Sequence, residues 1–189
     1  SARRQRQMCI RDRDKTAPTS VIISSSTSGL IMSEMQENIE NAERFVVGHP
    51  FNPPHLIPLV EVVGGELTAA EVVEWTIDFY NLIGKHAIKI NKEVPGHLAN
   101  RLQAALWREA VLAVQNGLAS VEDVNAAVAQ GPGLRWALMG PHMIMNLAGG
   151  KGGLEQMLSH FAPGIQGWWQ TMMETPNMNQ KLQKTLVDG

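Results

Sequence analysis

Cysteine is almost absent from this sequence, which has one cysteine, Cys9, among its 189 residues. A single cysteine excludes an internal disulfide and any zinc site built from several cysteines. The chain also lacks a long apolar run, since no stretch approaches the ~20 residues of a membrane-spanning helix. No cationic start leads into an apolar stretch and a cleavage site, so we find no secretory signal. These absences predict a soluble protein of the cytoplasm without a resident metal.

Basic residues are scarce beyond the first fifteen positions. Those positions hold six of the 16 basic residues and two of the 18 acidic ones, which leaves 10 basic and 16 acidic residues and a net charge of −6. An acidic body argues against a nucleic-acid partner, because neutralising phosphates requires clustered lysine and arginine. The six early basic residues are Arg3, Arg4, Arg6, Arg11, Arg13 and Lys15.

The first fifteen residues show no apolar periodicity and join abruptly onto a strand-like segment. We expect residues 1–15 to be disordered and non-native, an extension of the kind that translated adapter sequence adds to assembled fragments. The alternative is a basic arm that binds nucleic acid or a membrane surface.

A glycine-rich phosphate-binding turn of the form G-x-G-x-x-G is missing as well. Gly131-Pro132-Gly133 begins like that motif, but Trp136 stands where the third glycine belongs. The glycines of residues 149–153 have neither the spacing nor the Ser/Thr of a phosphate loop. We interpret both segments as helix breaks.

The first half of the chain alternates strand and helix patterns. Helices are expected at residues 32–39 and 68–84, the second opened by a capping box in which Thr68 and Glu71 satisfy the first amides. Alternation of this kind predicts an α/β fold for residues 16–93. The strands are expected at residues 20–24, 45–48, 59–63 and 86–90.

The second half, residues 94–189, has no strand signal and predicts an all-helical domain. Trp107 lies at helical spacing and is expected in the core, as are the methionines near residues 139–145. The boundary between the two parts is placed near residue 93, at Val94-Pro95-Gly96. The helices are expected at residues 97–115, 120–131, from 140 onward, 153–162, 163–173 and 178–187.

Three polar residues, Ser28, His49 and Glu61, lie beside the ends of apolar strands. Ligands of open α/β sheets bind at the carboxyl edge of the strands. A histidine moves protons near neutral pH, and a carboxylate on its second nitrogen fixes the tautomer and supports the imidazolium. In the alternative interpretation these residues have no catalytic role: the histidine caps a helix, and the glutamate lies on a solvent-exposed edge of the sheet. The other five histidines, at positions 55, 86, 97, 142 and 160, are expected to be surface or capping groups.

Three segments, SSSTSGL, VVGHPFNPPHLIPLVEVVGG and KEVPGHLANRL, together resemble the 3-hydroxyacyl-CoA dehydrogenase family. The similarity runs from about residue 18 to at least residue 160. Two further segments, GPGLRWALMGP and LAGGKGG, resemble the branch that contains L-carnitine dehydrogenase and L-gulonate 3-dehydrogenase. The resemblance implies that residues 16–93 are the second half of a Rossmann NAD-binding domain, whose first half is missing, and that residues 94–189 form the helical dimerisation domain.

The resemblance also implies roles for single residues. His49 takes the proton of the substrate 3-hydroxyl while hydride passes to NAD, and Glu61 orients His49. Ser28 lies near the reacting oxygen and the nicotinamide, Asn52 contacts the cofactor, and Asn100 binds substrate. The implied enzyme is a homodimer that oxidises the 3-hydroxyl of an acyl-CoA thioester or of a free acid such as carnitine or gulonate.

Two interpretations fit Arg135 and Trp136. An arginine binds carboxylates bidentately and a tryptophan face binds quaternary ammonium groups, which would suit a carnitine-like substrate. A salt-bridged arginine beside a core tryptophan fits equally well. For the whole chain, a second reading is a non-catalytic helical dimerisation module whose α/β half is vestigial.

Overall fold

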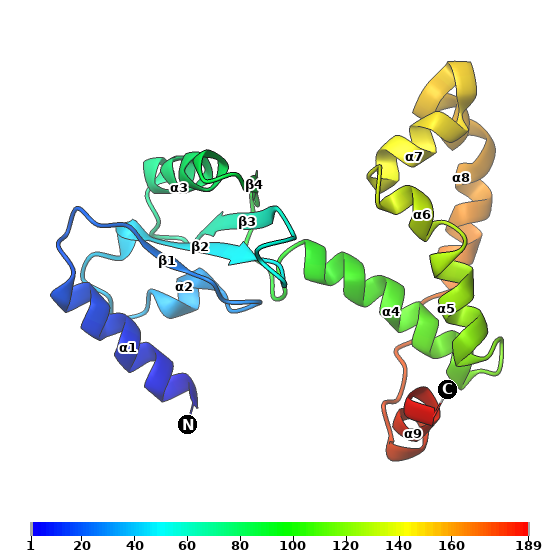
Figure 1. Ribbon diagram of the computed structural model, residues 1–189, viewed down its shortest axis with the longest axis horizontal. Coiled ribbons are helices and arrows are strands. Elements are labelled where there is room, and N and C mark those ends of the chain that lie inside the picture. Colours follow the sequence, from blue (N-terminus) through cyan, green and yellow to red (C-terminus); the bar gives the residue numbers. More distant parts are fainter. Residues whose placement is uncertain (1, 189) are drawn as a thin grey trace. The chain divides into compact units, whose positions relative to one another are not determined.

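A computed structural model of the chain describes residues 2–188, with side chains from residue 9 onward. The chain divides into two compact units, Ser1–Gln103 and Ala104–Gly189. The first contains a four-stranded sheet with helices, and the second contains helices alone (Figure 1). This division confirms the predicted fold class, an α/β part followed by an all-α part.

The sheet of the first unit has the order β1-β2-β3-β4. Strand β2 pairs in parallel with β1 and antiparallel with β3, and β3 pairs in parallel with β4. Strand β1 is therefore an edge strand within the described residues. The strands are β1 (Ile23–Ser25), β2 (Phe45–Pro50), β3 (Leu59–Gly64) and β4 (His86–Lys89).

Helices cover both faces of this sheet. Successive strand residues point to opposite faces, so Val47 packs against α2 (Met32–Met35) while Val46 packs against α3 (Ala70–Leu82). A short 3-10 helix, η1 (Ala42–Arg44), leads into β2. The two faces thus bury separate apolar clusters, as expected for an α/β layer structure.

The start of α3 differs from the expected capping box. Its N-cap residue is Ala69, which makes no side-chain cap. The Oγ1 of Thr68 instead donates to the carbonyl of Phe45 at 2.7 Å and accepts from the amide of Gly65 at 2.8 Å. Thr68 therefore connects the β3–α3 turn to β2 instead of capping α3.

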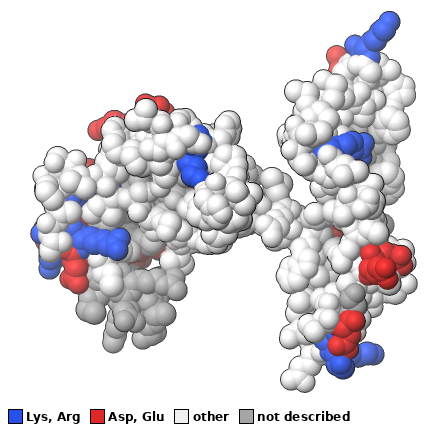
Figure 2. Space-filling model, in the orientation of Figure 1, with Lys and Arg blue, Asp and Glu red and all other residues white. Residues whose placement is uncertain are grey.

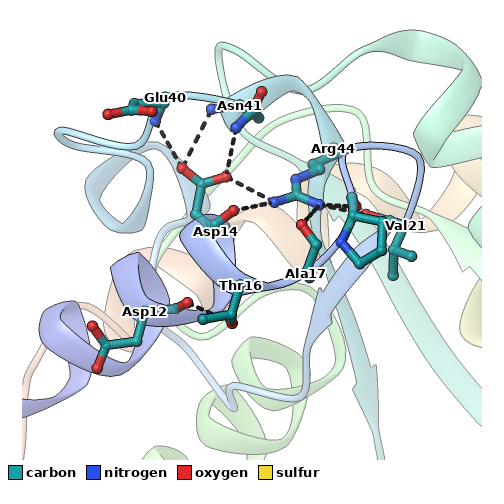
Figure 3. A network of polar contacts seen from close by, with 9 residues as sticks. Asp12, Asp14, Thr16, Ala17, Val21, Glu40, Asn41 and Arg44 are labelled. Atoms are coloured by element: carbon teal, nitrogen blue, oxygen red, sulfur yellow. Dashed lines mark hydrogen bonds and ion pairs between the residues drawn. The ribbon is translucent and has the colours of Figure 1, made fainter.

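The first residues also differ from the expectation of disorder, because Ala2–Thr16 form helix α1. Asp14 is buried near its end and accepts at 2.9 Å from Arg44, whose guanidinium also donates to the carbonyls of Ala17, Pro18 and Val21 (Figure 3). A periodicity search misses such an anchor, because the contact is between charged side chains far apart in sequence.

The environment of Asp14 alters its titration. Burial raises the pKa of its carboxyl, but hydrogen bonds from Arg44, from Asn41 and from the amides of Glu40 and Asn41 outweigh burial and lower the pKa below the ordinary value of 3.8. The folded chain therefore stabilises the ionised form of the Asp14 carboxyl group.

The second unit contains α5 (Val121–Ala129), α6 (Gly133–Trp136), α7 (Pro141–Ala148), α8 (Gly153–Thr171) and α9 (Gln180–Asp188), with the 3-10 helix η2 (Gly150–Gly152). Helix α4 (Ala99–Gln115) begins in the first unit and ends in the second. Ser120 caps α5 by accepting from the amide of Asp123 at 3.0 Å.

Two expectations for this unit are wrong. Helix α8 is continuous where two helices were expected, with Pro163 inside it. Trp107 is 58% exposed rather than in the core, and Met143 and Met145 are also exposed. Helical spacing identifies an apolar face but does not say what covers it. Among the described helices, none is both long and apolar enough to cross a membrane, and the cytoplasmic location stays a prediction.

Candidate active site

The register of β2 and β3 brings His49 and Glu61 together. The chain turns back after Pro50, so β3 runs antiparallel to β2 with Glu61 directly opposite His49. Directly opposed residues point to the same face of a sheet, with their Cβ atoms close together. Twelve positions apart in sequence, the two side chains therefore meet.

A buried hydrogen bond joins this pair. The Nδ1 of His49 lies 2.9 Å from Oε2 of Glu61, and the residues are 4% and 0% exposed. The second carboxylate oxygen accepts from the amides of Leu98 at 3.0 Å and Ala99 at 2.8 Å, at the N-terminus of α4. Helix N-termini favour negative charge, so a carboxylate with three N–H donors is well held there. Because Glu61 accepts, Nδ1 of His49 carries the proton and Nε2 is left as the basic nitrogen.

Two rings pack against the imidazole of His49. The ring centroid of Phe51 lies at 4.9 Å, and that of His97 at 5.3 Å. His97 is buried and its side chain bonds the carbonyl of Thr27, so the expectation of a surface or capping group is wrong for this residue. The other four histidines outside the pair are exposed, namely His55, His86, His142 and His160.

The polar loop after β1 is held by the segment that precedes α4. Three successive loop carbonyls accept hydrogen bonds: that of Thr27 from Nε2 of His97 at 3.2 Å, that of Ser28 from Nδ2 of Asn100 at 2.8 Å, and that of Gly29 from the amide of Gly96 at 3.5 Å. A Cβ on Gly29 would lie 3.2 Å from the nitrogen of Gly96, so this close approach favours glycine. Asn100 thus lies beside Ser28 through a backbone contact that the sequence did not predict.

A cavity of about 830 Å³ lies along the same loop. This volume is in the range of small-molecule pockets. Ser28 lines it and is exposed, as a ligand-contacting hydroxyl requires. The other lining residues are Cys9, Ile10, Arg13, Ser25, Ser26, Thr27, Gly29, Leu30 and Met35.

The remaining predicted site residues are Asn52, Arg135 and Trp136. Asn52 is exposed in the turn that follows β2. Arg135 and Trp136 belong to the second unit, on α6, and both are exposed. Trp136 is 42% exposed, which does not fit a core tryptophan, and Arg135 forms no ion pair with any described side chain.

His97 is the site residue that sequence reasoning missed. Its only signal was its place in the segment GHLAN, three residues before Asn100. Histidines before a helix are common caps, and nothing in the pattern indicated that its side chain turns inward to reach both Thr27 and His49. Among the side chains that the structure describes, no three of the types His, Cys, Asp and Glu gather closely enough to hold a metal ion.

Comparison with known families gives two matches that together span nearly the whole chain. Residues 4–94 match the 3-hydroxyacyl-CoA dehydrogenase NAD-binding domain, and residues 96–189 match the C-terminal domain of the same family. The first match begins within the segment that we expected to be non-native.

Curated relatives point the same way. L-carnitine dehydrogenase of Streptomyces coelicolor is 51% identical over 176 residues, covering 93% of this chain and 55% of the relative. The enzyme of that name from Pseudomonas aeruginosa is 44% identical over 89% of this chain and 52% of its own length. The chain thus spans about half the length of these relatives.

Solved structures with the same fold include an NAD⁺-dependent dismutase, 5-formyl-3-hydroxy-2-methylpyridine 4-carboxylic acid 5-dehydrogenase. It is 31% identical with a TM-score of 0.82, over 97% of this chain and 57% of that one. A second is 3-hydroxybutyryl-CoA dehydrogenase of Escherichia coli K12, 26% identical with a TM-score of 0.69, over 98% of this chain and 37% of that one.

Proposed function

Because the chain belongs to the 3-hydroxyacyl-CoA dehydrogenase family, we propose that it forms the catalytic part of an NAD-dependent 3-hydroxyacid dehydrogenase. The chain spans about half the length of its curated relatives, so the full-length enzyme would be a longer protein that also contains the pyrophosphate-binding part of the nucleotide-binding domain. The observation that carries the proposal is the buried hydrogen bond between His49 and Glu61.

The geometry suits His49 for removing a proton from a hydroxyl group. With Nδ1 bonded to Glu61, Nε2 accepts the proton of the substrate 3-hydroxyl, and the carboxylate stabilises the imidazolium that forms. Ser28 would hydrogen-bond to the reacting oxygen, and Asn100 holds the loop that carries Ser28. The product is the 3-keto acid.

The residues present fit one end of NAD. The family match assigns NAD as the cofactor, which supplies the acceptor for the substrate hydride when bound. Ser28 and Asn52 would hold its nicotinamide end, with Ser28 on the cavity beside β1. The chain has no G-x-G-x-x-G turn for the pyrophosphate, so the other end would be held by the first half of the domain, next to the free edge of β1.

A small free acid of the carnitine type is the substrate that we favour over an acyl-CoA thioester. The L-carnitine dehydrogenases match at up to 51% identity, and the body of the chain is acidic, which suits a zwitterion with a trimethylammonium group better than a phosphate-rich substrate. Exposed Arg135 and Trp136 would bind the carboxylate and the trimethylammonium group.

A homodimer formed by the second unit is part of this proposal. Large apolar side chains are exposed on α4 and α8, among them Trp107, Phe161, Trp168 and Trp169. On the face drawn in Figure 2, the charged side chains of this unit lie in a few small groups with uncharged surface between them. Exposed apolar surface of this kind marks protein interfaces.

Turnover by the full-length enzyme tests the function. We expect NAD reduction with L-carnitine and slower reduction with 3-hydroxybutyryl-CoA, while the chain alone should bind NAD weakly in calorimetry because it lacks the pyrophosphate turn. A folded full-length protein without turnover on either substrate would support the alternative, a dimerisation module with a vestigial α/β half.

A further inference from the structure

His97 has a backbone conformation that residues other than glycine seldom adopt. Its φ is +53°, and it follows Gly96 at +80°, so two successive residues are left-handed. Glycine adopts this region without strain, whereas a residue with a Cβ does so at a cost. Among the described residues other than glycine, only Asn38 also has a positive φ. A histidine at this position therefore has a conformational cost that glycine would not have.

The side chain of His97 is buried and makes two contacts with the site. Its Nε2 lies 3.2 Å from the carbonyl oxygen of Thr27, and because a carbonyl only accepts, Nε2 carries the proton. Its ring lies 5.3 Å from that of His49, centroid to centroid, at an interplanar angle of 46°. Only 2% of His97 is exposed, so both contacts lie in the interior of the first unit.

We propose that His97 is a positioning residue that sets the direction of the His49 ring and holds the loop bearing Ser28. This inference rests on the proposed function of His49. The hydrogen bond to Glu61 anchors only one nitrogen of His49, so the packing of His97 and Phe51 against the ring fixes where Nε2 points. The bond to Thr27 holds the loop one residue before Ser28, and the following turn places the amides of Leu98 and Ala99 on Glu61.

Two variants of the full-length enzyme separate these contacts. His97→Gly removes the side chain but favours the left-handed backbone, so the turn and the amides on Glu61 are kept. His97→Phe keeps a ring beside His49 but loses the donor to Thr27. His86→Phe, an exposed histidine on β4, serves as the matched control.

Kinetics and histidine-selective ¹⁵N NMR provide the readouts. We expect His97→Gly to lower kcat about 10- to 100-fold, since misplacing a reacting group by about 1 Å costs rates of this order, with KM changed less than kcat. The ring ¹⁵N signals of His49 should broaden or shift in His97→Gly. In His97→Phe they should stay near those of the unsubstituted enzyme, with an intermediate kcat. His86→Phe should change neither.

Unchanged kcat and unchanged His49 signals in His97→Gly would overturn the proposal. If this variant does not fold, His97→Asn replaces it, because asparagine tolerates the left-handed region but lacks the ring. Absence of turnover in the unsubstituted enzyme would instead reject the proposed function, and the His49 signals would still report whether His97 positions the ring.

Discussion

The two compact units differ in what they bury. All seven buried polar or charged residues of the described chain belong to the first unit, as do 11 of the 16 buried hydrophobic ones. The second unit exposes its largest side chains, with Trp168 at 68% and Trp169 at 64% exposure. Both units hold buried polar atoms without a partner among the described residues: Nε of Arg44 in the first, and Nε of Arg108 and Oε2 of Glu109 in the second. The units thus differ in where their polar residues are buried and in the large apolar side chains that the second unit exposes, which suit a partner.

Breaking the His49–Glu61 pair should give the largest effect, because His49 is the proposed base and Glu61 is its buried partner. In the full-length enzyme, His49→Gln should lower kcat by roughly 10²–10⁴, the usual contribution of a positioned general base. Glu61→Gln should lower kcat as well, since a neutral amide does not stabilise the imidazolium. The double variant should lose much less than the product of the single losses.

Steady-state kinetics on the three variants measures this coupling. Fully multiplicative losses would mean that Glu61 acts elsewhere, and an active His49→Gln enzyme would remove the central claim. Circular dichroism controls for folding, because Glu61 also binds the first amides of α4.

The Asp14–Arg44 pair tests whether the buried polar groups of the first unit stabilise it. Asp14→Asn should lower the free energy of unfolding by about 2–4 kcal/mol at neutral pH, because Arg44 is left buried without its counter-ion. Deleting residues 1–15 would remove Asp14 and should destabilise the chain in the same way. Deleting residues 1–8 only should have little effect, since that leaves Asp14 in place.

The pH dependence has a definite sign. Because hydrogen bonding lowers the pKa of folded Asp14, its stabilising contribution is complete above the unfolded pKa and is lost as pH falls through the folded value. Urea unfolding at pH 7 and near pH 3 should therefore show the difference between Asp14→Asn and the unsubstituted protein shrinking at low pH. Asp12→Asn, on an exposed side chain, is the control. A difference that does not change with pH would contradict this account.

The sequence predicted the helices and strands better than the contacts between side chains. Alternating patterns were sufficient to find all four strands and to separate an α/β part from a helical part, because burial imposes periods of 2 and 3.6. Proximity of His49 and Glu61 was predicted, but not the antiparallel register that produces it. Thr68, Asp14 and His97 were misread because their partners are distant in sequence and leave no local period. Trp107 was misread because spacing does not distinguish a covered apolar face from an exposed one.

The exposed tryptophans Trp168 and Trp169 test whether the second unit forms a homodimer. If the second unit forms a homodimer, the pair of changes Trp168→Ser and Trp169→Ser should raise the dimer dissociation constant about 10- to 100-fold, since buried aromatic residues dominate interface energies. Trp75→Ser on α3 of the first unit, 53% exposed, is the matched control and should leave assembly unchanged. Sedimentation velocity measures both. An equal rise of the dimer dissociation constant in Trp75→Ser would contradict a dimer interface specific to the second unit.

Trp136 gives the smallest expected effect and asks whether one exposed tryptophan of the second unit serves the substrate rather than a partner. Cation–π contacts contribute roughly 0.5–2 kcal/mol, so Trp136→Ala in the full-length enzyme should weaken kcat/KM for L-carnitine about two- to thirtyfold. The same change should leave 3-hydroxybutyryl-CoA turnover nearly unaltered, because that substrate has no trimethylammonium group. Trp75→Ala controls for loss of an exposed tryptophan away from the site. Equal losses on both substrates would assign Trp136 a structural role, and a loss that appears only at low protein concentration would assign it to the dimer interface.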